Sequence, residues 1–185
     1  MKINERIARV RLYTCALLST PKSVQVICIR KGLNGKSEPH LRRLQVPRPD
    51  TRVALQIFLH ECAHYLLHRN YPNITKPFYL KEWEAESWSI NRMRECNIPV
   101  PREALRIARR NVARRIMQSG ILVLEQQIDL RAARFAWGRY AKAWLRAIER
   151  AYARGDREIY FWCPDRTAVS AGPPGDWPIS LNNKD

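Results

Sequence analysis

The hydrophobic pattern near the N-terminus predicts a first helix followed by two strands. Residues 23–29 are β-branched and partly alternating, which is typical of a strand. Gly32 and Gly35 then supply a turn, and residues 41–46 form a second candidate strand, which Pro47 ends. The pattern therefore predicts a small β-structure in the first third of the chain.

The next predicted element is a helix that is apolar on nearly every face. Asp50 and Thr51 are candidates for its N-cap, and the helical pattern continues to about His68. A helix that is hydrophobic all round is typical of a domain interior, so its polar residues need a specific explanation. Its large apolar positions are Val53, Leu55, Ile57, Phe58, Leu59, Leu66 and Leu67.

The remaining pattern is mainly helical. A helix is predicted from about Lys81 to Cys96, ended by the proline-containing stretch 98–101, and two long helices are predicted over 102–154 with a break at Ser119-Gly120. We therefore expect an α+β fold. It has a core in residues 1–101, a basic helical extension in 102–163 and a disordered tail in 164–185.

Charge changes this picture because it is strongly positive and unevenly distributed. The chain has 33 Lys and Arg against 17 Asp and Glu, for a net charge of +16. Residues 1–50 carry +8 and residues 101–155 carry +9, whereas residues 51–100 carry only +1 and hold three of the four histidines. Such a surface attracts polyanions, and the candidate chemistry lies in the nearly neutral segment.

Cysteine usage and hydropathy indicate the compartment. The five cysteines form an odd set without a C-x-x-C pair, so a disulfide scaffold is not expected. No apolar run approaches the roughly 20 residues of a spanning helix, so no membrane contact is expected. We therefore expect a cytoplasmic protein.

The predicted buried helix contains the motif H-E-x-x-H, formed by His60, Glu61, Cys62, Ala63 and His64. Residues four apart lie on one face of a helix, so two imidazoles can reach one metal ion while the glutamate acts as a general base. The motif is expected by chance roughly 0.005 times in a chain of this composition. The alternative is a core helix whose histidines bond to backbone carbonyls and whose glutamate pairs with an arginine.

A catalytic zinc needs a third protein ligand and an open position. Glu82 and Glu86 lie four residues apart near the start of the next helix. Residues at this spacing share one helix face, so either carboxylate could be the ligand. The other carboxylate would then orient a histidine. We expect His68 to support the site rather than bind the metal, because a fourth protein ligand would close the catalytic position.

These residues make the sequence similar to the ImmA/IrrE family of metallo-endopeptidases. The resemblance covers roughly residues 20–101, and the last third of the chain lies outside it. The chain departs from the family pattern at Ala63, Glu86 and Trp88. The matching residues are His60, Glu61, His64, Leu67, His68, Glu82, Glu84 and Ala85.

The resemblance implies a zincin-like core in which a small sheet packs on the H-E-x-x-H helix. It implies that His60, His64 and Glu82 bind Zn²⁺ and that Glu61 is the general base. It also implies cleavage of a helix-turn-helix repressor, which would relieve repression of mobile-element or stress genes. Candidates to stabilise the oxyanion of such a reaction are Tyr65, His68, Tyr71 and Tyr79.

Two alternative functions fit the same residues. A SprT-like protease acting on DNA-held proteins would share the zinc helix, but the E-x-E-A run at 82–85 argues against it. A nucleic-acid-binding protein with a structural zinc site is the other alternative. The basic helical extension favours some nucleic-acid contact, through Arg139, Lys142, Arg146 and Arg150 on a face that adjoins a row of aromatic residues.

Overall fold

The computed structural model describes residues 2–19, 24–29, 34–69, 76–119 and 128–154. The chain forms two compact units, one from residues 1–76 and 81–106 and the other from residues 77–80 and 107–185. The fold is α+β, mostly helical with a small mixed sheet, as the sequence predicted. The division between the units falls inside a helix, a few residues after the predicted boundary at 101.

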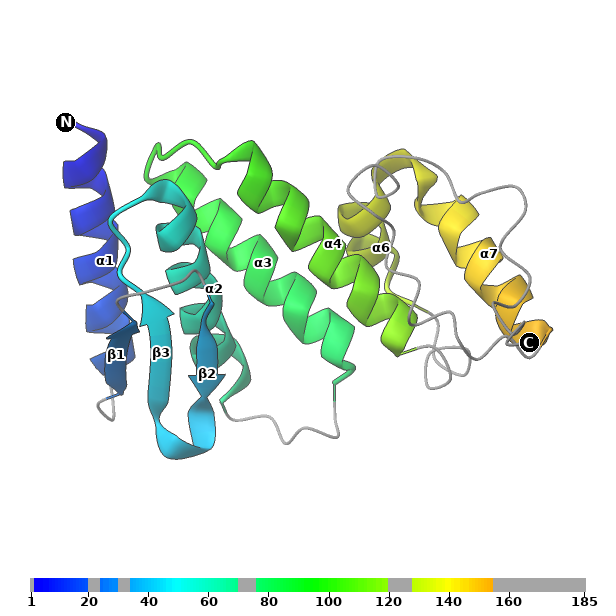
Figure 1. The fold of residues 1–185 in the computed structure, drawn as a ribbon, viewed down its shortest axis with the longest axis horizontal. Coiled ribbons are helices and arrows are strands. Elements are labelled where there is room, and N and C mark those ends of the chain that lie inside the picture. The colour runs from blue at the N-terminus through cyan, green and yellow to red at the C-terminus, as the bar shows by residue number, and fades with distance from the viewer. Residues whose placement is uncertain (1, 20–23, 30–33, 70–75, 120–127, 155–185) are drawn as a thin grey trace, which may run out of the picture. The chain divides into compact units, whose positions relative to one another are not determined.

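The first unit contains a three-stranded sheet and the helices around it (Figure 1). The sheet has the order β1-β3-β2, in which β1 is parallel and β2 antiparallel to the central β3. Helices α3 and α4 continue into the second unit. The elements are α1 (Ile3–Ser19), β1 (Gln25–Ile29), β2 (Lys36–Glu38), β3 (Arg43–Pro47), α2 (Arg52–His68), α3 (Phe78–Glu95) and α4 (Arg102–Gln118).

Strand β2 was not predicted, because three residues are too few to show an alternating pattern. The predicted second strand also begins later than expected, since Pro39–Leu41 forms a 3₁₀ turn and Arg42 has a left-handed backbone with φ 50°. Glu38 forms one ion pair within β2 and one across to β3. Glu38 lies 2.8 Å from both the Lys36 ammonium and the Arg43 guanidinium, and these two bonds lower its pKa.

The core of the first unit lies between the sheet and helix α2, which runs along one face of the sheet (Figure 1). The central strand contributes Leu44 and Val46, both with 0% exposure. The predicted burial of α2 is confirmed for most of its apolar residues, but Leu67 is exposed. The core side chains of the three helices that meet here are Ile7, Val10, Leu18, Leu55, Phe58, Leu59, Cys62, Tyr65 and Met93.

Helix α3 begins at Phe78, three residues before the predicted start, directly after Pro77. Its C-terminus is a Schellman motif, in which the Asn97 N–H donates to the Arg94 carbonyl at 2.9 Å and the Ile98 N–H donates to the Met93 carbonyl at 2.8 Å. Asn97 supplies the left-handed residue, with φ 53°. This cap buries Met93 and Ile98 in the core and so fixes the part of α3 that lies in the first unit.

The second unit contains the last turns of α4 and a helical hairpin. The hairpin consists of α6 (Leu130–Trp137), a 3₁₀ turn (Gly138–Tyr140) and α7 (Ala141–Ala153). The predicted long helix up to Arg154 is therefore wrong: it breaks at Gly138, which has φ 57° and ψ −129°, a conformation that side-chain-bearing residues rarely adopt. The predicted disordered tail at 164–185 lies outside the described residues.

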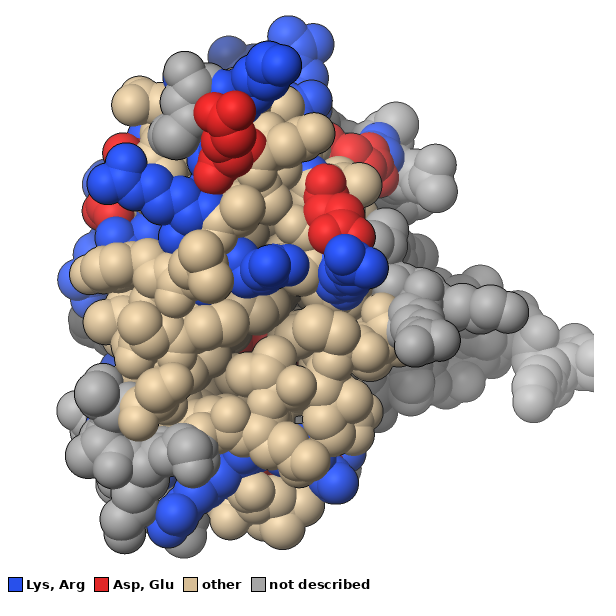
Figure 2. All heavy atoms as spheres, turned by 90° about the vertical axis from the view of Figure 1, so that its left-hand side faces the viewer, with Lys and Arg blue, Asp and Glu red and all other residues tan. Residues whose placement is uncertain are grey.

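Three further features concern the hydropathy of the helices, the surface and the cysteines. None of the helices in the described part of the chain is both long and apolar enough to span a membrane. Seen from the side of α1 and β1, a broad central area of the surface is largely uncharged (Figure 2). Leu12 and Tyr13 of α1 and Ile27 of β1 are exposed apolar or aromatic residues. Cys15, Cys28, Cys62 and Cys96 are all free thiols, as expected for a chain without a disulfide scaffold.

We predict that Thr51→Ala will lower the free energy of unfolding by about 1 kcal/mol. The Thr51 hydroxyl accepts a hydrogen bond from the Ala54 N–H at 3.1 Å and caps α2, so its removal leaves that amide without its partner. Urea denaturation measures the change, and Thr51→Ser, which keeps the hydroxyl, is the control. Equal stability of the Ala and wild-type proteins would show that the cap contributes nothing.

Candidate metal centre

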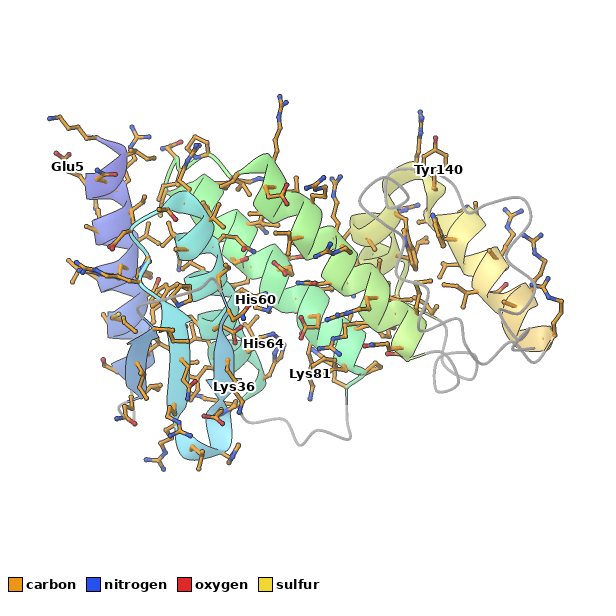
Figure 3. The ribbon with its side chains drawn as sticks, in the orientation of Figure 1. Glu5, Lys36, His60, His64, Lys81 and Tyr140 are labelled. Carbon is orange, nitrogen blue, oxygen red and sulfur yellow. The ribbon has the colours of Figure 1, made fainter. Side chains whose placement is uncertain are left out.

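Helix α2 places His60 and His64 one turn apart on the side that faces α3 (Figure 3). The Nε2 atoms of the two imidazoles lie 3.0 Å apart. The helix can hold this arrangement because its other faces are fixed by Phe58, Leu59 and Cys62 in the core. The sequence motif thus produces a pair of imidazole nitrogens directed at one point.

Glu82 of α3 provides the third donor. Its carboxylate oxygens lie 3.7 Å from His60 Nε2 and 3.5 Å from His64 Nε2, and one ligand atom from each of the three residues fits within 4.8 Å of the others. A tetrahedral zinc site with bonds of about 2.0–2.1 Å has ligands about 3.3–3.4 Å apart. The three separations of 3.0, 3.5 and 3.7 Å lie around this value, the two Glu82 distances being made by different oxygens, so small side-chain adjustments would let the three groups hold a zinc ion.

Glu86, the other carboxylate that sequence reasoning left open, lies on the opposite side of His60. Its Oε1 is 3.4 Å from His60 Nδ1. That is an ion-pair distance without hydrogen-bond geometry, and Nδ1 has no other partner among the described residues. The Gln56 side-chain amide donates to Glu86 Oε2 at 2.6 Å and holds the carboxylate in place. Glu86 therefore orients a histidine, whereas Glu82 joins the donor set.

Carboxylates dominate the electrostatics of His60. Burial by itself would lower its pKa, but Glu86, Glu82 and Glu61 around the ring raise it to about 9. In the absence of a metal, the imidazole is thus the cation that compensates these acids. A divalent ion can fill the same electrostatic role, because the site already concentrates negative charge around it.

His64 has a different support, through His68. The Nδ1 atoms of the two rings lie 3.3 Å apart, and His68 Nε2 lies 2.9 Å from Glu84 Oε2. If the His64 Nε2 lone pair is kept for a metal ion, His64 Nδ1 donates to His68 and His68 Nε2 donates to Glu84. Lys76 closes the chain, with its ammonium 2.6 Å from Glu84 Oε1. His68 thus supports His64, as expected.

The pKa values of His68 and Glu84, which support His64, are both shifted. Burial lowers the pKa of His68 against the opposing effect of its bond to Glu84, which favours the neutral ring that the assigned tautomer requires. Burial acts to raise the pKa of Glu84, but the bonds from Lys76 and His68 outweigh it and lower the pKa. The carboxylate therefore stays ionised as an acceptor for the imidazole.

Glu61 lies beside the donor set with its side chain nearly buried, at 9% exposure. Burial raises its pKa, although His60 and His64 act in the opposite direction. Within the described residues its carboxylate accepts no hydrogen bond. The side chain is confined by the backbone of Gly35, where an added Cβ would lie 2.5 Å from Glu61 Cγ and 2.8 Å from Oε1. Gly35 therefore allows the sheet to approach Glu61 closely.

The residues considered for the oxyanion have other surroundings. Tyr65 is buried, with the Arg69 guanidinium 5.7 Å from its ring centroid. The Tyr79 hydroxyl accepts a hydrogen bond from the Asp129 N–H within the second unit. Tyr65, His68 and Tyr79 thus each have a packing or hydrogen-bonding role, and Tyr71 lies outside the described residues.

Sequence reasoning missed several supporting residues. Gln56 had a local signal, because it is a polar residue in an apolar helix, four positions before His60 and so on the same face. The sequence contains no such local signal for Ser89 or Gly35. The Ser89 hydroxyl lies 3.3 Å from the Gln56 amide nitrogen. The roles of Ser89 and Gly35 arise from contacts between elements that are distant in sequence.

We predict that Glu86→Gln will weaken zinc binding about 10–100-fold, as expected for the loss of a residue that orients a ligand. Glu82→Gln should weaken zinc binding by more than this. Glu82 offers its oxygens to both imidazole Nε2 atoms, whereas Glu86 contacts only Nδ1 of His60. Competition with a chromophoric chelator measures the affinities. Glu95→Gln, at the exposed end of α3, is the matched control and should leave the affinity unchanged. The reverse order of the two losses would make Glu86 the ligand.

Comparison of the chain with known protein families, with curated protein sequences and with solved structures gives no match. The resemblance to the ImmA/IrrE metallo-endopeptidases therefore depends on the motif residues, and the geometry around His60, His64 and Glu82 stands independently of it.

Proposed function

We propose that this protein is a zinc-dependent endopeptidase of the cytoplasm that cleaves a helix-turn-helix transcriptional repressor. The observation that carries the enzyme class is the donor set of His60, His64 and Glu82 with the carboxylate of Glu61 beside it. Three protein ligands leave one position of a tetrahedral zinc for water or substrate, as in catalytic sites. The repressor as substrate follows from the ImmA/IrrE resemblance.

Each group has a defined role in peptide hydrolysis. A zinc ion held by the three ligands supplies Lewis acidity to a carbonyl oxygen and to a water molecule. Glu61 accepts the proton of the attacking water on its carboxylate and then donates it to the leaving nitrogen. Glu86 and His68 hold the two imidazoles in orientation, so the ligands need little reorganisation during the reaction.

The position of the sheet favours a polypeptide as the substrate. Strand β2 is at the edge of the three-stranded sheet, and the residue directly before it, Gly35, lies against Glu61. An extended peptide can pair with an edge strand through backbone hydrogen bonds. A peptide bound along β2 would pass close to Glu61, which favours cleavage within a chain.

A structural zinc site accounts less well for the same geometry. Structural sites are closed by four protein ligands, whereas three side chains converge here among the residues that the structure describes. A structural site would also give no role to Glu61, whose nearly buried carboxylate is not among the converging ligands. Burying a carboxylate without a hydrogen-bond partner is costly, so a role in catalysis explains its presence better. The geometry therefore favours catalysis.

We predict that Glu61→Gln will retain zinc affinity and lose at least about 100-fold in cleavage rate, because general acid–base catalysis contributes about 10²–10⁴-fold. The zinc-loaded protein is incubated with a denatured-proteome peptide library and with the helix-turn-helix protein encoded nearest to its gene, and mass spectrometry detects new termini. Glu95→Gln serves as a control of equal charge change.

The two substrates separate the parts of the proposal. Zinc-dependent cleavage of the library without cleavage of the repressor would contradict only the proposed substrate. Absence of cleavage in both, or full activity of Glu61→Gln, would contradict the proposed mechanism.

We predict that Gly35→Ala will reduce the cleavage rate, on the order of 100-fold for a displacement near 1 Å, while zinc affinity is retained. The three atoms nearest to the new Cβ all belong to Glu61, so the methyl group would displace that side chain first. The measurement is the rate of library cleavage together with zinc affinity. Lys36→Ala, at the neighbouring exposed position, controls for changes in the strand itself. A Gly35→Ala protein with wild-type rates would show that the close approach has no role in catalysis.

A further inference from the structure

The α6–α7 hairpin of the second unit carries a dense group of exposed cations. Residues 130–154 include seven Lys and Arg and one acidic residue, Glu149. Within the described residues, the Arg131 guanidinium is paired with Asp129 at 2.6 Å. The six others are all exposed: Arg134, Arg139, Lys142, Arg146, Arg150 and Arg154.

The hairpin buries its apolar side internally. The rings of Trp137 and Trp144 stack with centroids 5.6 Å apart and planes 10° apart, and Ile148 is also buried. The break at Gly138 permits this packing, because the chain reverses there and brings α6 against α7. The cations are consequently the surface of a folded hairpin.

Lys142, Arg146 and Arg150 follow one another at four-residue steps along α7. Residues at this spacing lie on one face of a helix, about 6 Å apart along its axis. They therefore form a continuous cationic stripe. The stripe faces no acidic residue within the helix apart from Glu149, which is itself exposed.

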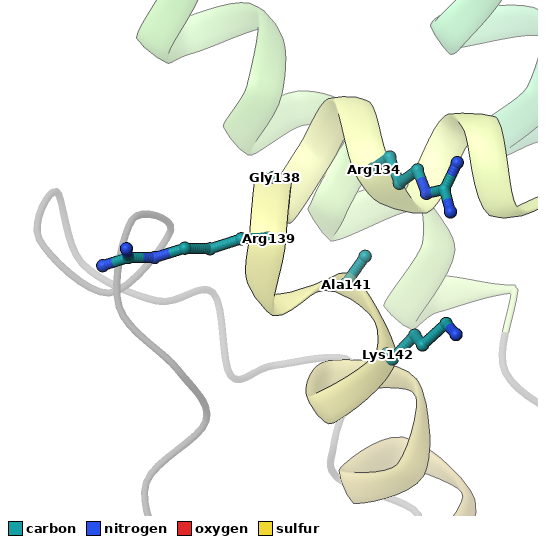
Figure 4. Close-up of a pocket in the computed structure, with 5 residues that line it drawn as sticks. All are labelled: Arg134, Gly138, Arg139, Ala141 and Lys142. Carbon is teal, nitrogen blue, oxygen red and sulfur yellow. The ribbon is translucent and has the colours of Figure 1, made fainter.

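The stripe continues into a cavity of about 390 Å³ at the turn of the hairpin. The charged ends of Arg134 and Lys142 project to the same side of the turn, whereas Arg139 points the opposite way (Figure 4). The Arg139 guanidinium donates to the Tyr140 hydroxyl at 2.8 Å. The sequence placed Arg139 on the basic face. In the structure Arg139 also lines the cavity, but its side chain points away from those of Arg134 and Lys142.

We propose that Arg134, Lys142, Arg146 and Arg150, with Arg139 at the other side of the turn, form a binding surface for the phosphate backbone of duplex nucleic acid. Regularly spaced cations that outnumber the single neighbouring carboxylate, Glu149, fit a regular polyanion. A basic helix that binds a membrane surface instead needs an exposed apolar face to insert, and here that face is buried in the Trp137–Trp144 stack. The proposal concerns binding alone and does not depend on peptidase activity.

The test measures binding of the full-length protein to a fluorescent 20-base-pair DNA duplex by anisotropy between about 50 and 200 mM NaCl. We expect the logarithm of the affinity to fall linearly with the logarithm of salt concentration. The triple variant Lys142→Gln, Arg146→Gln, Arg150→Gln should reduce the slope by about 0.9 for each lost phosphate contact, about 2.7 in total. Near-UV circular dichroism of the tryptophan stack verifies that the hairpin remains folded.

A matched triple variant separates the stripe from net charge. Arg9→Gln, Arg52→Gln and Arg94→Gln remove the same charge from exposed positions of the first unit, and we expect an unchanged slope. Equal losses in the two triples would show that only net charge acts, and would overturn the proposal. Wild-type binding that does not weaken with salt would also overturn it. Stripe-dependent binding to phosphatidylserine vesicles without DNA binding would assign the surface to membranes instead.

Discussion

The convergence of His60, His64 and Glu82 on one point is the constraint on which the first unit depends. Burying imidazole and carboxylate groups is costly unless a metal ion or hydrogen-bond partners compensate them. The Nε2 atoms are nevertheless only 3.0 Å apart, with Glu82 oxygens within 3.7 Å of both rings. Such an arrangement persists only if the helices are held independently. The core against β3 holds α2, and the Schellman cap that buries Met93 and Ile98 holds α3.

The three glutamates near the start of α3 have distinct tasks, although they lie within five residues of each other. Glu82 faces both imidazoles, Glu86 faces the back of His60, and Glu84 reaches His68. Each imidazole consequently has a carboxylate behind it, directly for His60 and through a second histidine for His64. Each of the three acids thus has its own contact with a histidine, and the chain from His64 through His68 to Glu84 favours one tautomer of His64.

The cationic stripe and the candidate chemistry belong to different units. The donor set lies in the first unit, in a segment that is nearly neutral, whereas the α6–α7 hairpin in the second unit presents its cations around two stacked tryptophans. Keeping the two apart has a physical advantage. A high density of cations beside the donor set would oppose the binding of a divalent ion, while a stripe on a separate unit can attract a polyanion without this cost.

The sequence by itself determined what depends on short-range periodicity. The N-cap at Thr51, the buried helix up to His68, the paired imidazoles four residues apart and the existence of α3 follow from the order of neighbouring residues, because helical geometry fixes the relation of residues up to four apart. Only the tertiary structure decided between Glu82 and Glu86, placed Gly35 against Glu61, formed strand β2 and turned Arg139 away from the stripe. These features depend on how separate elements pack, and packing is set by contacts that no local pattern encodes.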